Sequence, residues 1–354
     1  MALSSICRKR GRGHRGSALA LVLIVMSTMV ILSVGLAYRT RVEMRLVHAN
    51  AQRTQAYYLA LGGIERIKAL LSHEELTPLT IARICQFTST ATEEELFGQF
   101  KDFAPDEGEL VSYSLRDELA CLSVNNSDPA SWTNVDCVSR ELRSSISDWM
   151  DEDDDISPEG AEADFYERLE FPYTSKNGVF IALKELLFLK SVTPEIYLGE
   201  DLNRNSLLDE NEKDGQLRIP PDNEDNLLDL GLVDVFTVYG DGRLNINTVS
   251  KPILAALPGL DEGVAELILA QRAGPDGALG TEDDACIASA KDIADVEGLT
   301  ELQIELLGHY CVFDSEYFRI FSCAQLKGSF KCYLMATVRF TDSGPQILLL
   351  ERLL

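Results

Sequence analysis

The chain has 354 residues, a length that exceeds one small domain and favours about two folded regions. Its 57 acidic residues against 32 basic ones give a formal net charge of −25, so the phosphates of nucleic acid would be repelled and no nucleic-acid partner is expected. The charge is unevenly placed, because residues 1–16 contain five basic residues and no acidic one.

An apolar segment follows the basic one. Residues 17–38 form an uncharged run that would be about 33 Å long as a helix, enough to cross a hydrocarbon core of about 30 Å. A buried core helix is the alternative, but an uncharged run of this length beside a basic cluster favours a transmembrane helix. The positive-inside rule then keeps the basic N-terminus in the cytoplasm and places the acidic remainder outside it.

The junction between these segments differs from an ordinary signal peptide, which is cleaved after its apolar region. Here the small residue Gly16 precedes the apolar run. This order resembles the prepilin signal, in which a dedicated peptidase cuts after glycine on the cytoplasmic face, and it implies cleavage between Gly16 and Ser17. Apolar residues continue at three- and four-residue spacing as far as Leu71, so one helix is predicted over residues 17–72.

Two later segments resemble each other and predict a helical unit that is used twice. One begins with LSVNN at residues 122–126, and the other begins with LNINT at residues 244–248. The second copy contains LPGL at residues 257–260, a tight turn between apolar helices that is typical of helix-hairpin-helix motifs. Such turns often bind DNA, so a membrane-anchored DNA receptor is a competing hypothesis. The acidic surroundings favour a structural or partner-docking role instead; the residues are Asp261, Glu262 and Glu266.

The C-terminal region predicts a small antiparallel sheet. Residues 315–340 alternate β-forming residues around Lys327-Gly328, and residues 345–354 are expected to add a third strand. With a two-residue turn, Cys323 would face Cys332 in a non-hydrogen-bonded pair, which predicts a disulfide. Spacing does not pair the other cysteines, although disulfides would suit an oxidising compartment. The shortest options are Cys121 with Cys137 and Cys286 with Cys311.

Four segments together resemble the protein K family of the general secretion pathway, which are minor pseudopilins of type II secretion systems. They are residues 148–169, 172–178, 184–197 and 238–259. Leu21 agrees with this, because most pilin subunits have glutamate at the fifth mature position and the K family characteristically lacks it. The resemblance implies an α+β fold: a pilin-like long N-terminal helix and a small antiparallel sheet, interrupted by a large, mainly helical insertion with two helix-hairpin-helix or SAM-like units.

The resemblance also implies how the chain is divided and what it does. Its expected parts are a leader (1–16), the N-terminal helix (17–72), a first pilin-like part (73–116), the insertion (117–311, with units 117–198 and 232–311 flanking 199–231) and the C-terminal strands (312–354). It implies an inner-membrane protein processed by prepilin peptidase, with a periplasmic head at the pseudopilus tip. Its partners would be the I- and J-type minor pseudopilins, bound through N-terminal helices and heads. A minor pilin of a related type IV pilus is an alternative, and no catalytic motif points to an enzyme.

Acidic loops predict calcium binding, because calcium takes six to eight hard oxygen ligands. Residues 201–212 have the spacing of an EF-hand loop, although position 6 lacks glycine; a solvated acidic loop is the alternative. Its expected ligands are Asp201, Asn203, Asn205, the Leu207 carbonyl, Asp209 and Glu212. A second loop, rich in turn glycines, brings together Asp276, Glu282, Asp283 and Asp284. A further acidic group is Asp148, Asp151, Asp153 and Asp155.

Overall fold

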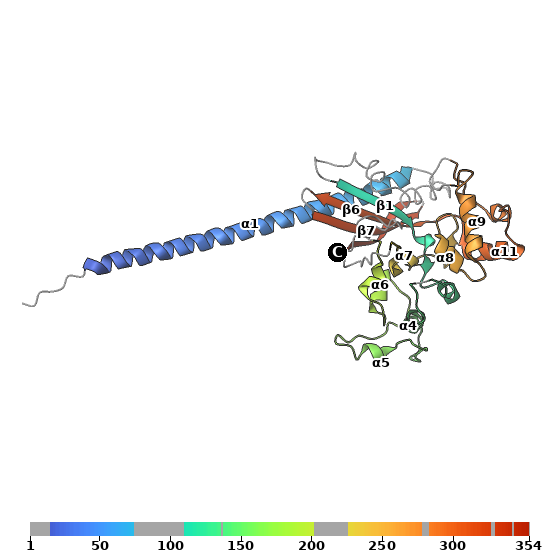
Figure 1. The fold of residues 1–354 in the computed structure, drawn as a ribbon, viewed down its shortest axis with the longest axis horizontal. Helices are drawn as coiled ribbons and strands as arrows, with labels where there is room; N and C mark the ends of the chain where they lie inside the picture. The colour runs from blue at the N-terminus through green and yellow to red at the C-terminus, as the bar shows by residue number, and fades with distance from the viewer. Residues whose placement is uncertain are drawn as a thin grey trace, which may run out of the picture. The chain divides into compact units, whose positions relative to one another are not determined.

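The computed structural model describes residues 15–73, 110–135, 137–201, 226–277, 283–326, 330–341 and 343–353. The chain divides into two compact parts, Met1–Gln55 and Ala56–Leu354. Figure 1 traces the chain from the N-terminal helix to the C-terminal strands. The combination of a long N-terminal helix, a small antiparallel sheet and a helical region confirms the expected α+β fold class.

Helix α1 (Arg15–His73) is continuous over 59 residues, which confirms the helix predicted over 17–72. Its first part is long and apolar enough to cross a membrane by length and composition, with a mean hydropathy of 2.7 in its most apolar window. The apolar side chains of this part, such as Leu21 and Ile31, are exposed and are not covered by other residues of the protein. The expected cleavage residues, Gly16 and Ser17, lie in the first turn of α1, and the first fourteen residues lie outside the described part.

The sheet has four antiparallel strands in the order β1-β6-β7-β8, and it packs against the last turns of α1 (Figure 1). The strands are β1 (Leu110–Asp117), β6 (Tyr317–Leu326), β7 (Phe330–Thr341) and β8 (Gly344–Leu353). Ala56, Ala60, Ile64 and Ile67 of α1 are buried against it, at the three- and four-residue spacing of one helix face. A Cβ on Gly63 would lie 2.4 Å from the Ser322 hydroxyl, so only glycine allows the helix this close to β6.

The register of the β6–β7 hairpin corrects one prediction. Leu326 pairs with Phe330, so three residues separate the paired positions and the expected two-residue turn is wrong. Cys323 therefore faces Tyr333, while Cys332 faces Ala324. Because neighbouring residues of a strand point to opposite faces, the two cysteines lie on opposite faces of the sheet. The predicted disulfide is wrong, and Cys332 is a buried thiol on the α1 side.

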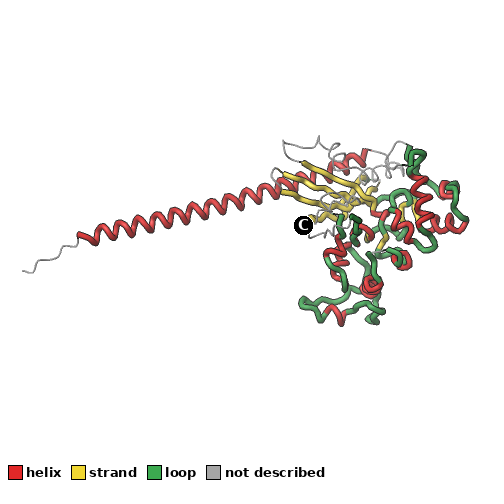
Figure 2. The backbone as a smooth tube through the Cα atoms, in the orientation of Figure 1, coloured by secondary structure: helices red, strands yellow, loops and turns green. Residues whose placement is uncertain are grey.

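Between β1 and β6 the chain forms mainly short helices joined by loops (Figure 2), and four two-residue strands frame them as two units. In the first unit β2 (Leu122–Ser123) pairs in parallel with β3 (Phe236–Thr237), and in the second β4 (Leu244–Asn245) pairs in parallel with β5 (Cys311–Val312). Between β2 and β3 lie η3 (Pro129–Trp132), α4 (Arg140–Met150), α5 (Ala163–Tyr166), η4 (Leu183–Phe188), α6 (Pro194–Leu198) and α7 (Leu232–Val235). Between β4 and β5 lie α8 (Lys251–Ala256), α9 (Glu262–Arg272), α10 (Ala290–Ala294) and α11 (Glu301–Tyr310).

One asparagine in each unit makes the same set of hydrogen bonds, as expected of a repeated arrangement. The first unit extends to Thr237, because β3 pairs with β2, so residues 232–237 belong to it and not, as expected, to the second unit. Asn125 accepts a hydrogen bond from the Phe180 N–H at 2.8 Å and donates to the carbonyls of Phe180 and Val238. Asn247 accepts from the Ile287 N–H at 2.8 Å and donates to the carbonyls of Ile287 and Phe313. Each asparagine lies three residues after the start of the opening strand and ties that strand to the end of its unit.

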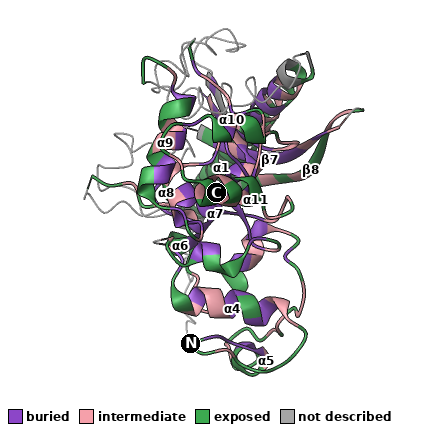
Figure 3. Ribbon diagram, turned by 90° about the vertical axis from the view of Figure 1, so that its right-hand side faces the viewer, coloured by how far each residue is buried: buried purple, intermediate pink, exposed green. Residues whose placement is uncertain are grey.

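The second unit contains the hairpin predicted at residues 257–260. Helices α8 and α9 pack against each other, with Leu257 and Leu260 buried in the turn between them, and the buried faces of both helices are visible in Figure 3. Gly259 has a φ of 81°, a conformation that costs glycine little and a side-chain-bearing residue more. Asp261 caps α9 by accepting a hydrogen bond from the Val264 N–H. The two short pairings suggested for the other cysteines are not formed, because Cys121 and Cys311 are buried thiols.

A buried ion pair joins the sheet to the helical insertion. Arg319 of β6 donates to both carboxylate oxygens of Glu118 at 2.9 and 2.7 Å, and to the Val233 carbonyl of α7 at 2.6 Å. Glu118 lies in η2 (Glu118–Ala120), directly after β1, and is 1% exposed. The hydroxyl groups of Thr237 and Thr337 also donate to its carboxylate. The sheet thus has α1 on one face and the insertion on the other.

Candidate metal centre

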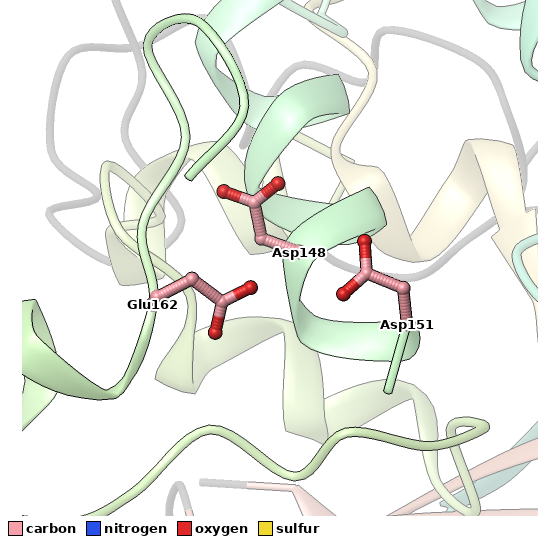
Figure 4. A group of neighbouring side chains, drawn as sticks. All are labelled: Asp148, Asp151 and Glu162. Atoms are coloured by element: carbon pink, nitrogen blue, oxygen red, sulfur yellow. The ribbon is translucent and has the colours of Figure 1, made fainter. Parts of the chain in front are cut away.

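Three carboxylates gather in the first helical unit, as Figure 4 shows: Asp148, Asp151 and Glu162. One ligand atom from each lies within 4.8 Å of those of the other two. Asp148 is in the last turn of α4, Asp151 is the residue that ends that helix, and Glu162 immediately precedes α5. Helical spacing of three residues brings the two aspartates to one side, and the loop between α4 and α5 brings the glutamate to them.

The local sequence explains how this loop closes. The Ser157 N–H donates to both oxygens of Asp148 at 3.2 Å, and the Gly160 N–H donates to the Ser157 carbonyl at 2.8 Å. A Cβ on Gly160 would lie 2.0 Å from the Asp148 carboxylate, so glycine is required for the loop to pass over it. Trp149 points away into the core, edge-on to Tyr166 at 5.3 Å, and anchors the end of α4.

Two of the three carboxylate residues are buried and Asp151 is half-buried, so their like charges are held close together at a cost in free energy. Asp148 is 0% and Glu162 is 2% exposed. Burial raises the pKa of Glu162, a hydrogen bond to the Ser175 hydroxyl lowers it, and the nearby Asp148, Asp151 and Asp154 raise it further. Burial, Asp153 and Asp148 raise the pKa of Asp151. Apart from this weak contact with Ser175, no residue in the described part of the chain hydrogen-bonds to either Glu162 oxygen, although buried carboxylates normally have such partners.

A hard cation would remove this cost. Calcium binds carboxylate oxygens at about 2.3–2.6 Å and accepts one or two oxygens from each carboxylate, so three carboxylates within one small volume suit it. The charged neighbours that shift the pKa values of Asp151 and Glu162 are all carboxylates. The nearby Lys190 pairs instead with Glu141 at 3.1 Å. The residues present therefore fit a calcium ion.

The structure places the predicted calcium ligands unevenly. In the EF-hand-like loop only Asp201 is described; the others lie outside the described residues, namely Asn203, Asn205, Leu207, Asp209 and Glu212. Asp201 is fully buried near Arg116. Burial would lower the pKa of Arg116, but its acidic surroundings, Asp234 and Asp201 among them, raise it. Asp201 is therefore one of the negative groups around Arg116, whose direct ion-pair partner is Asp234 at 3.0 Å.

In the second predicted loop, Asp276 and Asp283 are brought together, since the Asp276 N–H donates to the Asp283 carboxylate at 3.0 Å. Asp284 is 8% exposed, and Glu282 lies outside the described residues. In the third acidic group, Asp148 and Asp151 are confirmed as neighbours, whereas Asp153 and Asp155 are exposed in the loop that follows.

Sequence reasoning did not single out Glu162. It lies fourteen positions after Asp148, and only the path of the α4–α5 loop makes the two residues neighbours. The signal that was available is Gly160, because a glycine shortly before an acidic residue at a helix start permits a close approach of the backbone to a ligand group.

Comparison with known proteins places this region in context. Residues 134–199 match the family described as type II secretion system (T2SS), protein K, and this match contains all three carboxylates. The type II secretion system protein K of Aeromonas hydrophila is 24% identical over 217 residues, which are 54% of this chain and 62% of that protein. The chain therefore spans less than two thirds of the length of this relative. The resemblance to the protein K family is confirmed for the first helical unit.

A solved structure is also similar. The crystal structure of the GspK–GspI–GspJ complex from the enterotoxigenic Escherichia coli type 2 secretion system contains a chain that is 15% identical in sequence. The similarity covers 86% of this chain and 99% of that one, with a TM-score of 0.48.

Proposed function

We propose that this chain, whose first helical unit matches the type II secretion protein K family, is a minor pseudopilin of such a secretion system. One observation supports this proposal above all: the region that matches the family, residues 134–199, is inserted between two strands of a pilin-like framework. The framework consists of one continuous helix, apolar at its start and packed on an antiparallel sheet at its end. The role is structural: the protein initiates or caps a pseudopilus that drives protein export across the outer membrane.

The proposed location is the inner membrane, with α1 as a single transmembrane anchor and the acidic head in the periplasm. Prepilin peptidase would cut between Gly16 and Ser17 on the cytoplasmic side. N-terminal sequencing of the membrane-extracted protein should therefore read from Ser17. A Gly16→Asp variant should keep its first sixteen residues yet remain in the membrane fraction. A mature chain that begins after Tyr38 would contradict the proposal.

The proposed partners are the I- and J-type minor pseudopilins, which would bind through the outer part of α1 and through the head. Co-expression followed by purification on a tag at the head should recover both partners in stable proportion. A Tyr58→Asp substitution on the exposed face of α1, where Tyr58 is 65% exposed, should weaken that recovery without unfolding the head. Recovery of type IV pilus subunits instead would favour the related pilus machine.

We also propose that calcium binds the group of Asp148, Asp151 and Glu162 and stabilises the head. Binding to the folded state alone adds about 2.7 kcal/mol when free calcium exceeds its Kd a hundredfold. Because the folded-state pKa of Glu162 is raised, its ionised form destabilises the calcium-free protein at neutral pH. Glu162→Gln should therefore stabilise the calcium-free protein and abolish the gain from calcium.

The matched control is Glu167→Gln, an exposed glutamate in the same segment. Its calcium response should equal that of the unchanged protein. Thermal unfolding of the detergent-solubilised full chain, in excess calcium and in excess chelator, measures both effects. Equal calcium responses in the two variants would refute the site, and an unchanged melting temperature in chelator would refute calcium stabilisation.

The competing DNA-receptor hypothesis is weakened by the charges on the α8–α9 hairpin. Lys251, at the start of α8, lies 2.9 Å from Glu266 and 3.7 Å from Glu262 of α9. Its charge is therefore balanced within the hairpin and is not available for a phosphate. Salt-sensitive retention of DNA by the purified head would revive that hypothesis.

A further inference from the structure

The first helical unit carries large apolar side chains on its surface. Phe171 is 80%, Phe188 is 52% and Phe165 is 37% exposed. We call these three residues, together with the half-buried Tyr173, the aromatic patch. Soluble domains rarely expose aromatic residues in groups unless a ligand or partner covers them.

Ring contacts link Phe165, Tyr173 and Phe188 of the aromatic patch, and Phe171 lies two residues before Tyr173 in the chain. Tyr173 stacks on the fully buried Tyr166 at 5.3 Å, and the rings of Phe165 and Phe188 lie 5.3 Å from Tyr166 and 5.7 Å from Tyr173, respectively. The Tyr173 hydroxyl donates to the Phe188 carbonyl at 2.7 Å, which fastens the segment before η4 to the end of that helix. Because these rings are held by the core, a partner would not need to order them on binding.

Most charged residues in the segment that carries Phe165 and Phe171 are acidic, and Lys190, whose ammonium lies 5.6 Å from the centre of the Phe165 ring, is paired with Glu141. Residues 148–171 contain eleven acidic residues and one basic residue, Arg168, which already pairs with Asp164 at 3.0 Å. Eight of these acidic residues are exposed, and Figure 3 shows the segment around α5 as largely exposed. We call them the acidic rim; they are Glu152, Asp153, Asp154, Asp155, Glu159, Asp164, Glu167 and Glu170.

We propose that the aromatic patch docks a cationic amphipathic segment of another protein, whose apolar side chains cover the aromatic rings while its Lys or Arg residues face the acidic rim. Aromatic residues at the centre and charges at the edge are the usual arrangement of an interface, in which the centre supplies affinity and the charges supply specificity and association rate. The acidic rim disfavours two other occupants, a second copy of this acidic chain and an anionic lipid surface, because both would bring like charges together.

The experiment uses the full chain in detergent and a fluorescent Leu–Lys amphipathic peptide as the probe. Phe171→Ser combined with Phe188→Ser should weaken peptide binding about tenfold, the loss expected when two aromatic residues of an interface are truncated. The matched control is Leu302→Ser on α11, which removes an equally exposed apolar side chain, 64% exposed, in the other helical unit. This control should bind the peptide as the unchanged protein does.

Two further readouts separate the contributions. A Leu–Glu peptide of the same pattern should not bind, and Glu167→Gln combined with Glu170→Gln should weaken Leu–Lys binding mainly at low salt, where rim charges are least screened. Unchanged tryptophan fluorescence, from Trp132 and from Trp149 beside Tyr173, verifies that each variant is folded. The measurement is made with and without calcium, so the proposed metal centre is not a condition of the test.

The proposal is overturned if the Phe171→Ser/Phe188→Ser variant binds the Leu–Lys peptide as tightly as Leu302→Ser does, or if the Leu–Glu peptide binds equally well. It is also overturned if those two substitutions abolish self-association or binding to anionic vesicles while leaving peptide binding intact, because the occupant would then be another copy of the chain or a membrane.

Discussion

The buried pair of Arg319 and Glu118 offers the sharpest test of how the sheet and the insertion are held together. Glu118→Gln keeps the shape of the side chain and removes its charge, which leaves the Arg319 guanidinium buried without its counter-ion. Removing one member of a buried ion pair costs about 3–5 kcal/mol, much more than the pair itself contributes. Arg319 keeps its hydrogen bond to the Val233 carbonyl, so the fold should survive with a reduced free energy of unfolding.

Glu316→Gln is the control, because the Glu316–Arg339 pair lies 3.0 Å apart on the surface with both side chains more than 40% exposed. Its loss should cost less than about 1 kcal/mol. Urea unfolding of the solubilised full chain, followed by the fluorescence of Trp132 and Trp149, reports on the insertion. With a slope of about 1–3 kcal/mol per molar urea, Glu118→Gln should lower the unfolding midpoint by at least about 1 M. Equal midpoints for the two variants would refute the reasoning.

Acid dependence gives a second readout for the same pair. Burial alone would raise the pKa of Glu118, but the charge and hydrogen bonds of Arg319, together with the Thr237 hydroxyl and the charge of Arg116, lower it. Because the folded-state pKa is lowered, the ionised Glu118 carboxylate stabilises the protein at pH values above its ordinary pKa of 4.5. This stabilisation is lost as the pH falls through the lowered pKa of the folded state. Glu118→Gln should therefore unfold with a smaller acid dependence than the unchanged protein. If the two acid profiles are parallel, Arg319 does not hold the Glu118 carboxylate ionised.

Three further outcomes follow from the same structure. Asn247→Ala should lower the free energy of unfolding by about 1–3 kcal/mol in the same urea assay, because it leaves buried backbone groups unpaired. The control is Asn126→Ala, which removes an exposed side-chain hydrogen bond and should lower it by less than about 0.5 kcal/mol. Gly160→Ala should weaken calcium binding in a calorimetric titration, because its Cβ displaces the Asp148 carboxylate. A Cβ on Gly178 would meet only the Lys176 carbonyl oxygen, at an ordinary van der Waals distance of 3.9 Å, so Gly178→Ala should bind normally. The buried Cys332 thiol should react with iodoacetamide only after unfolding; a disulfide at Cys332 in a non-reducing peptide map would contradict the hairpin register.

Much of the architecture can be predicted from local patterns in the sequence. The apolar run and the spacing that continues it predict one helix over 17–72, and α1 runs from Arg15 to His73. Alternation of β-forming residues predicts the strands that became β6, β7 and β8. The LSVNN and LNINT segments reveal the duplication, because Asn125 and Asn247 perform the same task in both units. Such features depend on periodicity within a few turns or strand lengths, which the order of residues specifies directly.

Tertiary structure decided where residues distant in the chain meet. One additional residue between the paired positions of β6 and β7 turned Cys323 and Cys332 to opposite faces of the sheet, because side chains alternate at every position of a strand. The meeting of Asp148 with Glu162 depends on the path of a loop, and no spacing rule along the chain encodes it. Local periodicity determines which elements form, whereas loop length and the packing of those elements determine which side chains become neighbours.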